Sequence, residues 1–240
     1  MSSTSISKNI YYFTAGTNTD RPLVLVHGYG ASCYTWQRIL PYLAQHHQVF
    51  VVDLPGYGRS MLKGEWRLRE MGPQLAVWLR QMQLPPVTII GHSMGGAIAV
   101  HLATNAPELV KRLVLISTAG LPLQTNLLQL AFRSICSILQ PGNGRYPLKL
   151  LRDALQPRLR ILWQTAQEMA HSDFRTELAT ITIPTLIVWG EYDVLLPVSL
   201  GLTLSTTIPQ ATFITLPCGH RPMLALPAEL STLILQFLRE

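Results

Sequence analysis

Short runs of β-branched and aliphatic residues alternate with longer helical patterns along this 240-residue sequence, and this alternation constrains the fold most. Several runs, such as Leu23–Val26 and Leu186–Trp189, are apolar at every position, which is typical of parallel strands covered by helices on both faces. The alternation predicts βαβ units and therefore an α/β protein with a doubly wound, mostly parallel sheet. The predicted strands are Pro22–His27, Gln48–Asp53, Val87–Gly91, Arg112–Ser117, Pro184–Gly190 and Ala211–Leu216, with Ile10–Thr14 as a candidate antiparallel edge strand. The predicted helices are Ser32–Gln45, Glu70–Gln83, Ser93–Asn105, Val198–Thr207 and Pro227–Arg239.

One long segment interrupts this rhythm. Residues 121–181 contain helical patterns broken by proline and glycine but no strand-like run. We therefore expect a core formed by residues 1–120 and 182–240, with residues 121–181 inserted between two central strands as a helical cap. Such an insertion would lie over the carboxyl edge of the sheet, where open α/β sheets bind their ligands.

The composition excludes several classes of protein. The chain carries a formal net charge of +6, but no run of five basic residues supports nucleic-acid binding. Cys33, Cys136 and Cys218 lie far apart, which argues against disulfides and a zinc site and fits a reducing cytoplasm. No apolar run is long enough to span a bilayer, and the first ten residues lack the apolar core of a signal peptide.

The strongest chemical motif is Gly91-His92-Ser93-Met94-Gly95, which joins a predicted strand directly to a predicted helix. Gly-x-Ser-x-Gly in this context is a nucleophile elbow, a tight turn that needs small residues on both sides of the serine. The turn would expose the Ser93 hydroxyl above the sheet, at a helix N-terminus with free N–H groups. A serine that merely caps the helix is the structural alternative.

A nucleophilic serine needs a base, and the base needs a group that orients it. Asp193 follows one late strand and His220 follows the next, so loops at the same sheet edge could bring both to Ser93. The order Ser…Asp…His predicts His220 as the base and Asp193 as its orienting acid, with Glu191 competing for that role. We expect the backbone N–H groups of Tyr29 and Met94 to form the oxyanion hole.

The loop that contains Tyr29 also raises an alternative. Gly28-x-Gly30 after a strand resembles part of a dinucleotide-binding fingerprint, but Cys33 occupies the third glycine position. We therefore expect no nicotinamide cofactor.

Together these motifs resemble the α/β-hydrolase superfamily, from about Tyr11 to the C-terminus. Within it the chain is similar to compact microbial carboxylesterases, among them the pimeloyl-[acyl-carrier protein] methyl ester esterases. The resemblance implies hydrolysis of an ester or thioester through an acyl-serine intermediate, without a cofactor. Epoxide hydrolases and haloalkane dehalogenases of this family carry aspartate where this chain has Ser93, so the resemblance excludes these two classes. C–C hydrolases typically have asparagine at the position of His92 and tryptophan at the position of Arg221, so these two residues argue against a C–C hydrolase. Cofactor-free haloperoxidases share the triad and remain an alternative.

The predicted cap offers hypotheses about the substrate. Phe132, Ile135 and Leu139 could line an acyl pocket, and Arg133 and Arg152 could meet an acidic acyl-carrier protein or substrate. An ordinary solvated helix face explains the same charges. A non-catalytic ligand-binding protein and an interfacial lipase are further alternatives.

Overall fold

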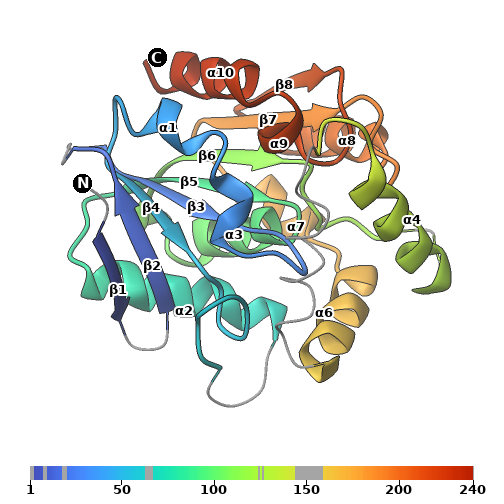
Figure 1. The fold of residues 1–240 in the computed structure, drawn as a ribbon, viewed down its shortest axis with the longest axis horizontal. Helices are drawn as coiled ribbons and strands as arrows, with labels where there is room; N and C mark the ends of the chain where they lie inside the picture. Colours follow the sequence, from blue (N-terminus) through green and yellow to red (C-terminus); the bar gives the residue numbers. More distant parts are fainter. Residues whose placement is uncertain are drawn as a thin grey trace.

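An eight-stranded sheet forms the centre of the molecule (Figure 1). The computed structural model describes residues 3–7, 10–17, 21–62, 67–123, 125, 127–143 and 159–239. The strands run in the order β1-β2-β4-β3-β5-β6-β7-β8, and all neighbouring pairs from β4 to β8 are parallel. The expected α/β class is therefore confirmed. The strand bounds are β1 Ser3–Ser7, β2 Ile10–Ala15, β3 Leu23–Val26, β4 Val49–Val52, β5 Val87–His92, β6 Val110–Ile116, β7 Thr185–Gly190 and β8 Ala211–Leu216.

The antiparallel end of the sheet contains one strand more than predicted. β2 pairs antiparallel with β4, as expected for Ile10–Thr14, but β1 rather than β2 forms the edge. The β1 sequence, Ser-Thr-Ser-Ile-Ser, contains no apolar run, so it gives no burial signal. Backbone pairing with β2 defines this edge strand.

Helices cover both faces of the sheet and produce two cores. Alternate residues of each central strand point to opposite faces, so Val24 and Val26 join one core while Leu23 and Leu25 join the other. The covering elements are η1 Cys33–Trp36, α1 Leu40–Leu43, α2 Leu68–Gln81, α3 Met94–Asn105, η2 Pro107–Leu109, α8 Val198–Thr207, α9 Pro222–Ala225 and α10 Pro227–Arg239. The layers place α2 and α3 on the face opposite α1, α9 and α10 (Figure 1).

The helix predicted over Ser32–Gln45 is wrong as a continuous element. The chain forms the short helix η1, a turn, and then α1, with Pro41 in the first turn of α1. Proline lacks the N–H that a helix interior requires, so it favours a new helix start at this point. The short helix α9 was not predicted.

The described residues between β6 and β7 form helices and connecting loops but no strand. It contains α4 Leu127–Leu139, α6 Leu159–His171 and α7 Arg175–Ala179, and α4 contacts α6. Figure 1 shows α4 and α6 projecting from one side of the sheet. We call residues 121–181, for which the sequence predicts a cap, the inserted segment. None of the described helices has the length and apolar character needed to cross a membrane.

Candidate active site

Ser93 lies at the junction between β5 and α3, near the middle of the sheet. Its backbone angles are φ 52° and ψ −117°, a region that residues other than glycine rarely adopt. The Ser93 N–H donates to Ile116 O at 2.9 Å, and Gly96 N–H and Ala119 N–H both donate to Ser93 O. The strained turn is therefore held from both sides by backbone hydrogen bonds.

The glycines around Ser93 allow backbone segments to approach one another closely. A side chain at Gly91 would overlap the backbone of Gly95 and Gly96, and one at Gly95 would overlap Val26 O and His27 O. These positions explain why the motif needs glycine two residues before and two residues after the serine.

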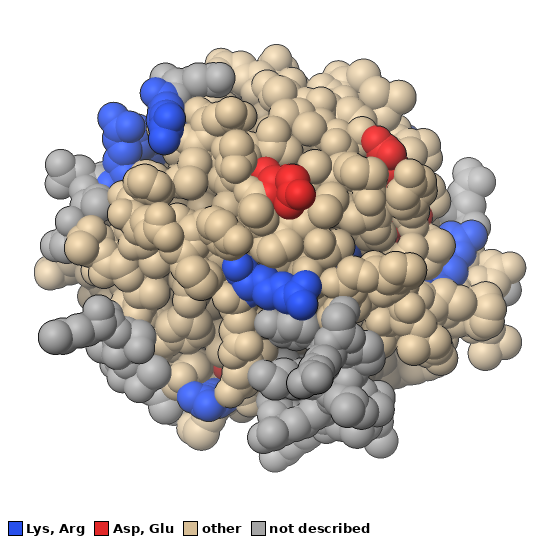
Figure 2. Space-filling model, turned by 45° about the horizontal axis from the view of Figure 1, so that its top comes forward, with Lys and Arg blue, Asp and Glu red and all other residues tan. Residues whose placement is uncertain are grey.

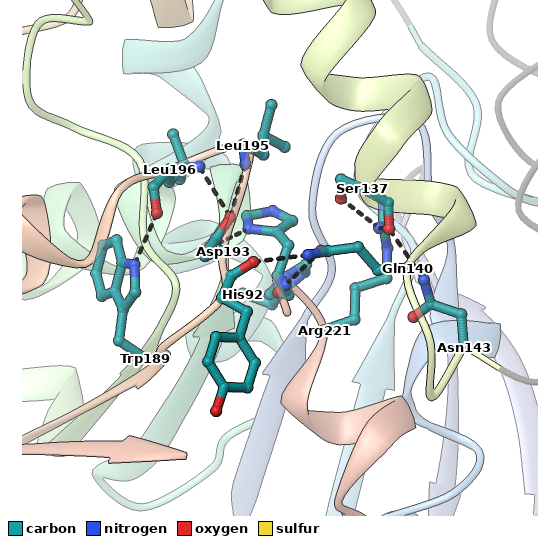
Figure 3. A network of polar contacts seen from close by, with 11 residues as sticks. His92, Ser137, Gln140, Asn143, Trp189, Asp193, Leu195, Leu196 and Arg221 are labelled. Carbon is teal, nitrogen blue, oxygen red and sulfur yellow. Dashed lines mark hydrogen bonds and ion pairs between the residues drawn. The ribbon is translucent and has the colours of Figure 1, made fainter. Parts of the chain in front are cut away.

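His220 and Asp193 come together at the carboxyl ends of β8 and β7. His220 Nδ1 lies 2.7 Å from Asp193 Oδ2, and both side chains are almost completely buried. The other carboxylate oxygen, Asp193 Oδ1, accepts from Leu195 N–H and Leu196 N–H at 2.9 Å each (Figure 3). Trp189 Nε1–H donates to Leu196 O and fixes the same loop. The carboxylate therefore has a single orientation towards the imidazole.

Glu191 does not take this position. Its side chain is exposed, and its Oε1 accepts from Thr215 Oγ1–H at 3.0 Å. Of the two acids that the sequence leaves open, the geometry places Asp193 at the imidazole.

Two backbone N–H groups near Ser93 match the predicted oxyanion donors. Met94 is the first residue of α3, and Tyr29 lies in the loop after β3. A Cβ on neighbouring Gly28 would lie 3.1 Å from Ser93 Cβ, so this loop passes close to the serine. In the described part of the chain, neither N–H donates to another protein atom. Within that part of the chain, both N–H groups are therefore without a protein acceptor.

An apolar cavity of about 600 Å³ opens at this point. Its wall includes Ser93, His220 and Tyr29, whereas most other lining residues are aliphatic or aromatic. The inserted segment supplies Leu121, Leu123, Leu130, Ala131, Ser134, Ile135, Ile138, Leu162, Trp163, Ala166 and Met169. The cavity can therefore hold an apolar chain beside a small polar centre.

The sequence of this chain matches that of a known protein family. A sequence model described as "alpha/beta hydrolase fold" matches residues 21–158, more than half of the chain. The chain belongs to the alpha/beta hydrolase fold family.

Relatives of this alpha/beta hydrolase cover nearly its whole length. The chain is 29% identical to the pimeloyl-[acyl-carrier protein] methyl ester esterase of Yersinia pseudotuberculosis, over 97% of this chain and 98% of the relative. It is 28% identical to the enzyme of that name from Pectobacterium atrosepticum, over 95% and 98% respectively. A solved bromoperoxidase from Bacillus anthracis superposes with a TM-score of 0.86 at 22% identity and covers 99% of this chain and 100% of its own. This structural similarity to the bromoperoxidase shows that the two proteins share a fold.

Of the substrate residues expected on α4, only Ile135 lies in the cavity wall. Ile135 lines the cavity, but Phe132 and Leu139 are 68% and 70% exposed and do not line it. Arg133 is partly buried and is also absent from the lining, and Arg152 lies outside the described residues. The apolar face of α4 is broader than the part of it that lines the cavity, so the sequence does not indicate which edge of that face turns inward.

The cavity wall also includes His92 and Arg221, which were not predicted to line it. His92 Nε2–H donates to His220 O at 2.9 Å, and burial beside His220 and Arg221 holds the pKa of His92 well below its usual range. His92 is therefore a neutral donor at neutral pH. Burial also lowers the pKa of Arg221 to about 10, which still leaves it charged at neutral pH. Their positions next to Ser93 and His220 in sequence are the only signal that could have indicated them.

Two other polar residues near the site, His27 and Asp53, form hydrogen bonds with backbone atoms of the surrounding loops. His27 Nδ1–H donates to Gly28 O at 2.8 Å, and its Nε2 accepts from Leu54 N–H at 3.0 Å. Asp53 accepts from Cys33 N–H and Arg59 N–H, so its carboxylate organises loops. Among the residues that the structure describes, no three potential ligands lie together in a way that could hold a metal ion.

Proposed function

We propose that this protein is a serine hydrolase that cleaves a carboxylic ester or thioester through an acyl-serine intermediate. The observation that carries the proposal is the buried His220–Asp193 contact of 2.7 Å in the wall of the cavity that Ser93 also lines. In this assignment Ser93 is the nucleophile, His220 is the general base, and Asp193 orients His220.

The reaction follows from these roles in two halves. His220 Nε2 takes the proton from Ser93 Oγ as that oxygen attacks the substrate carbonyl, and Asp193 stabilises the resulting imidazolium. The N–H groups of Met94 and Tyr29 stabilise the negative oxygen of the tetrahedral intermediate. The C–O or C–S bond then breaks, and His220 returns the proton to the leaving alcohol or thiol. In the second half, water attacks the acyl-serine with the same proton transfers, which releases the acid and restores Ser93.

The first test identifies the nucleophile directly. A fluorophosphonate probe should label the protein, and mass spectrometry should locate the label on Ser93. Ser93→Ala should not be labelled. Labelling at another serine, or equal labelling of the variant, would contradict the assignment.

The substrate proposal rests on the cavity. An apolar volume of about 600 Å³ next to Ser93 suits the aliphatic acyl part of an ester, and the inserted segment would act as the cap that forms its roof. We expect kcat/KM for p-nitrophenyl esters to rise with acyl length until the cavity is filled and then to fall.

Ile135→Trp should move that optimum to shorter esters, because a larger side chain takes volume from the cavity wall. Leu128→Trp on the same helix is the matched control, because Leu128 is 83% exposed and does not line the cavity. An unchanged profile in Ile135→Trp would contradict this position for the acyl chain.

The relatives' names suggest how the ester is delivered. They are named for an ester attached to an acyl-carrier protein, and we extend this delivery to the present chain as part of the proposal. Within the inserted segment, Arg160 and Arg175 are both exposed, and Arg175 pairs with Asp173 at 2.5 Å. On the face drawn in Figure 2, charged side chains are few and scattered.

If a carrier docks through such charges, the carrier-bound ester should be hydrolysed faster than the free ester at low salt. This advantage should shrink at high salt, because salt screens exposed charges. Equal and salt-independent rates for the two substrates would remove the carrier from the proposal and leave the esterase intact.

A further inference from the structure

Gln140 connects α4 to both loops that carry the acid and the base. It directly follows α4, and its Nε2–H donates to Tyr192 O at 2.6 Å, next to Asp193 (Figure 3). Its Oε1 accepts from His220 N–H at 3.4 Å. One carboxamide thus contacts the main chain of residues 52 and 80 positions away in sequence.

The two loops are shaped to receive this carboxamide. Tyr192 N–H donates to Cys218 O at 2.9 Å, so the loops are already joined by backbone. A side chain at Gly219 would overlap the carboxamide of Gln140, and one at Gly190 would overlap Gly219 O. Glycine at both positions therefore allows the loops and Gln140 to pack directly against one another.

The His220 peptide is held from its other side as well. His92 Nε2–H donates to His220 O while Gln140 accepts from His220 N–H. Both backbone groups of the base are therefore bound by side chains from elements outside its own loop.

The C-terminal end of α4 is itself fixed. Arg221 Nη1–H donates to Ser137 O at 3.0 Å and to Ser137 Oγ at 2.7 Å. Asn143 Nδ2–H donates to Ser137 O and Ile138 O. These donors satisfy carbonyl groups that the last turn of a helix leaves without partners, and a cation is favoured at a helix C-terminus. Gln140 therefore projects from an anchored base.

We propose that Gln140 is a positioning residue that holds the loops of Asp193 and His220 in the geometry required for proton transfer. The inference rests on the proposed function, since it assigns Gln140 a role only through those two side chains. It also makes the inserted segment part of the catalytic assembly, besides being part of the cavity wall. Misplacement of a catalytic group by about 1 Å can cost about 100-fold in rate.

Gln140→Ala should lower kcat for a p-nitrophenyl ester by about 10-fold to 100-fold, because the two loops lose their shared contact. KM should stay within about threefold, because Gln140 does not line the cavity. The matched control is Gln167→Ala, which removes an exposed glutamine from α6 and should leave kcat unchanged. The thermal midpoint of each variant gives the folded fraction at the assay temperature.

Gln140→Glu provides a readout that a purely structural role would not change. The carboxylate can still accept from His220 N–H, cannot donate to Tyr192 O, and adds a negative charge next to the His220 backbone. The acid limb of its kcat/KM profile should therefore move to higher pH. This variant also decides the question if Gln140→Ala does not fold.

Two results would overturn the positioning role. The first is an unchanged kcat in Gln140→Ala. The second is a loss of kcat in Gln140→Ala that is no larger than its loss of folded protein, combined with an unshifted pH profile in Gln140→Glu. Ser93→Ala, assayed in parallel, separates the two proposals. If Ser93→Ala is inactive while Gln140→Ala is fully active, only the role of Gln140 falls. If Ser93→Ala remains active, the proposed function falls and the role of Gln140 falls with it.

Discussion

Ser93→Ala is expected to lower kcat for p-nitrophenyl ester hydrolysis by about 10⁵-fold to 10⁶-fold. The reason is that the acyl-serine intermediate needs Oγ, and the remaining oxyanion donors and cavity provide only a small part of the rate. Steady-state assays with highly purified variant, normalised to folded protein, would measure the loss. A reduction of less than about 100-fold would show that another group is the nucleophile.

Ser93→Gly is the informative companion to this variant. Both variants lack the hydroxyl group of Ser93. Glycine adopts a positive φ without strain, whereas alanine at φ 52° remains strained. Ser93→Gly should therefore be more stable than Ser93→Ala by about 1 kcal/mol in denaturant unfolding. Equal stability of the two variants would mean that the turn stores little strain.

Asp193→Asn should reduce kcat by about 10⁴-fold, with the fold retained. The amide can keep an oxygen towards Leu195 N–H and Leu196 N–H, and its nitrogen then faces His220 Nδ1. A donor at that position favours the imidazole tautomer that presents a proton to Ser93 instead of a lone pair, so the base is lost. Steady-state kinetics at neutral pH would measure the effect.

Glu191→Gln is the matched control for this substitution. Glu191 lies two residues earlier in the same loop, but it is exposed and contacts Thr215. Its kcat should remain within about twofold of the wild type. A large loss in Glu191→Gln with little loss in Asp193→Asn would reverse the assignment of the acid.

The sequence predicts the parallel part of the sheet well, because strands buried on both faces leave unbroken apolar runs such as Leu23–Val26. The edge strand β1 lacks that signal, since its backbone pairs with β2 without an apolar run. The positions of Asp193 and His220 after neighbouring parallel strands predict their contact, because parallel strands bring their carboxyl ends to one edge of the sheet.

The sequence is less informative where the contacts depend on how α4 is rotated about its axis. α4 has one broad apolar face that includes Phe132, Leu139 and Ile138, so its sequence favours all three for the cavity although only Ile138 lines it. Gln140 has no sequence signal at all, because its partners are backbone atoms of Tyr192 and His220. Every residue has the same backbone atoms, so no residue type in the sequence marks the partners of Gln140.

The position of β5 within the sheet has a consequence for how the molecule opens. β5 has β3 and β6 as hydrogen-bonded neighbours, so the strand that leads to Ser93 can exchange its amide protons only when the centre of the sheet separates. His220 follows β8, which is the last strand of the sheet in the described part of the chain and pairs there with β7. Partial unfolding from that end would therefore detach His220 while β5 and the turn at Ser93 stay paired within the sheet.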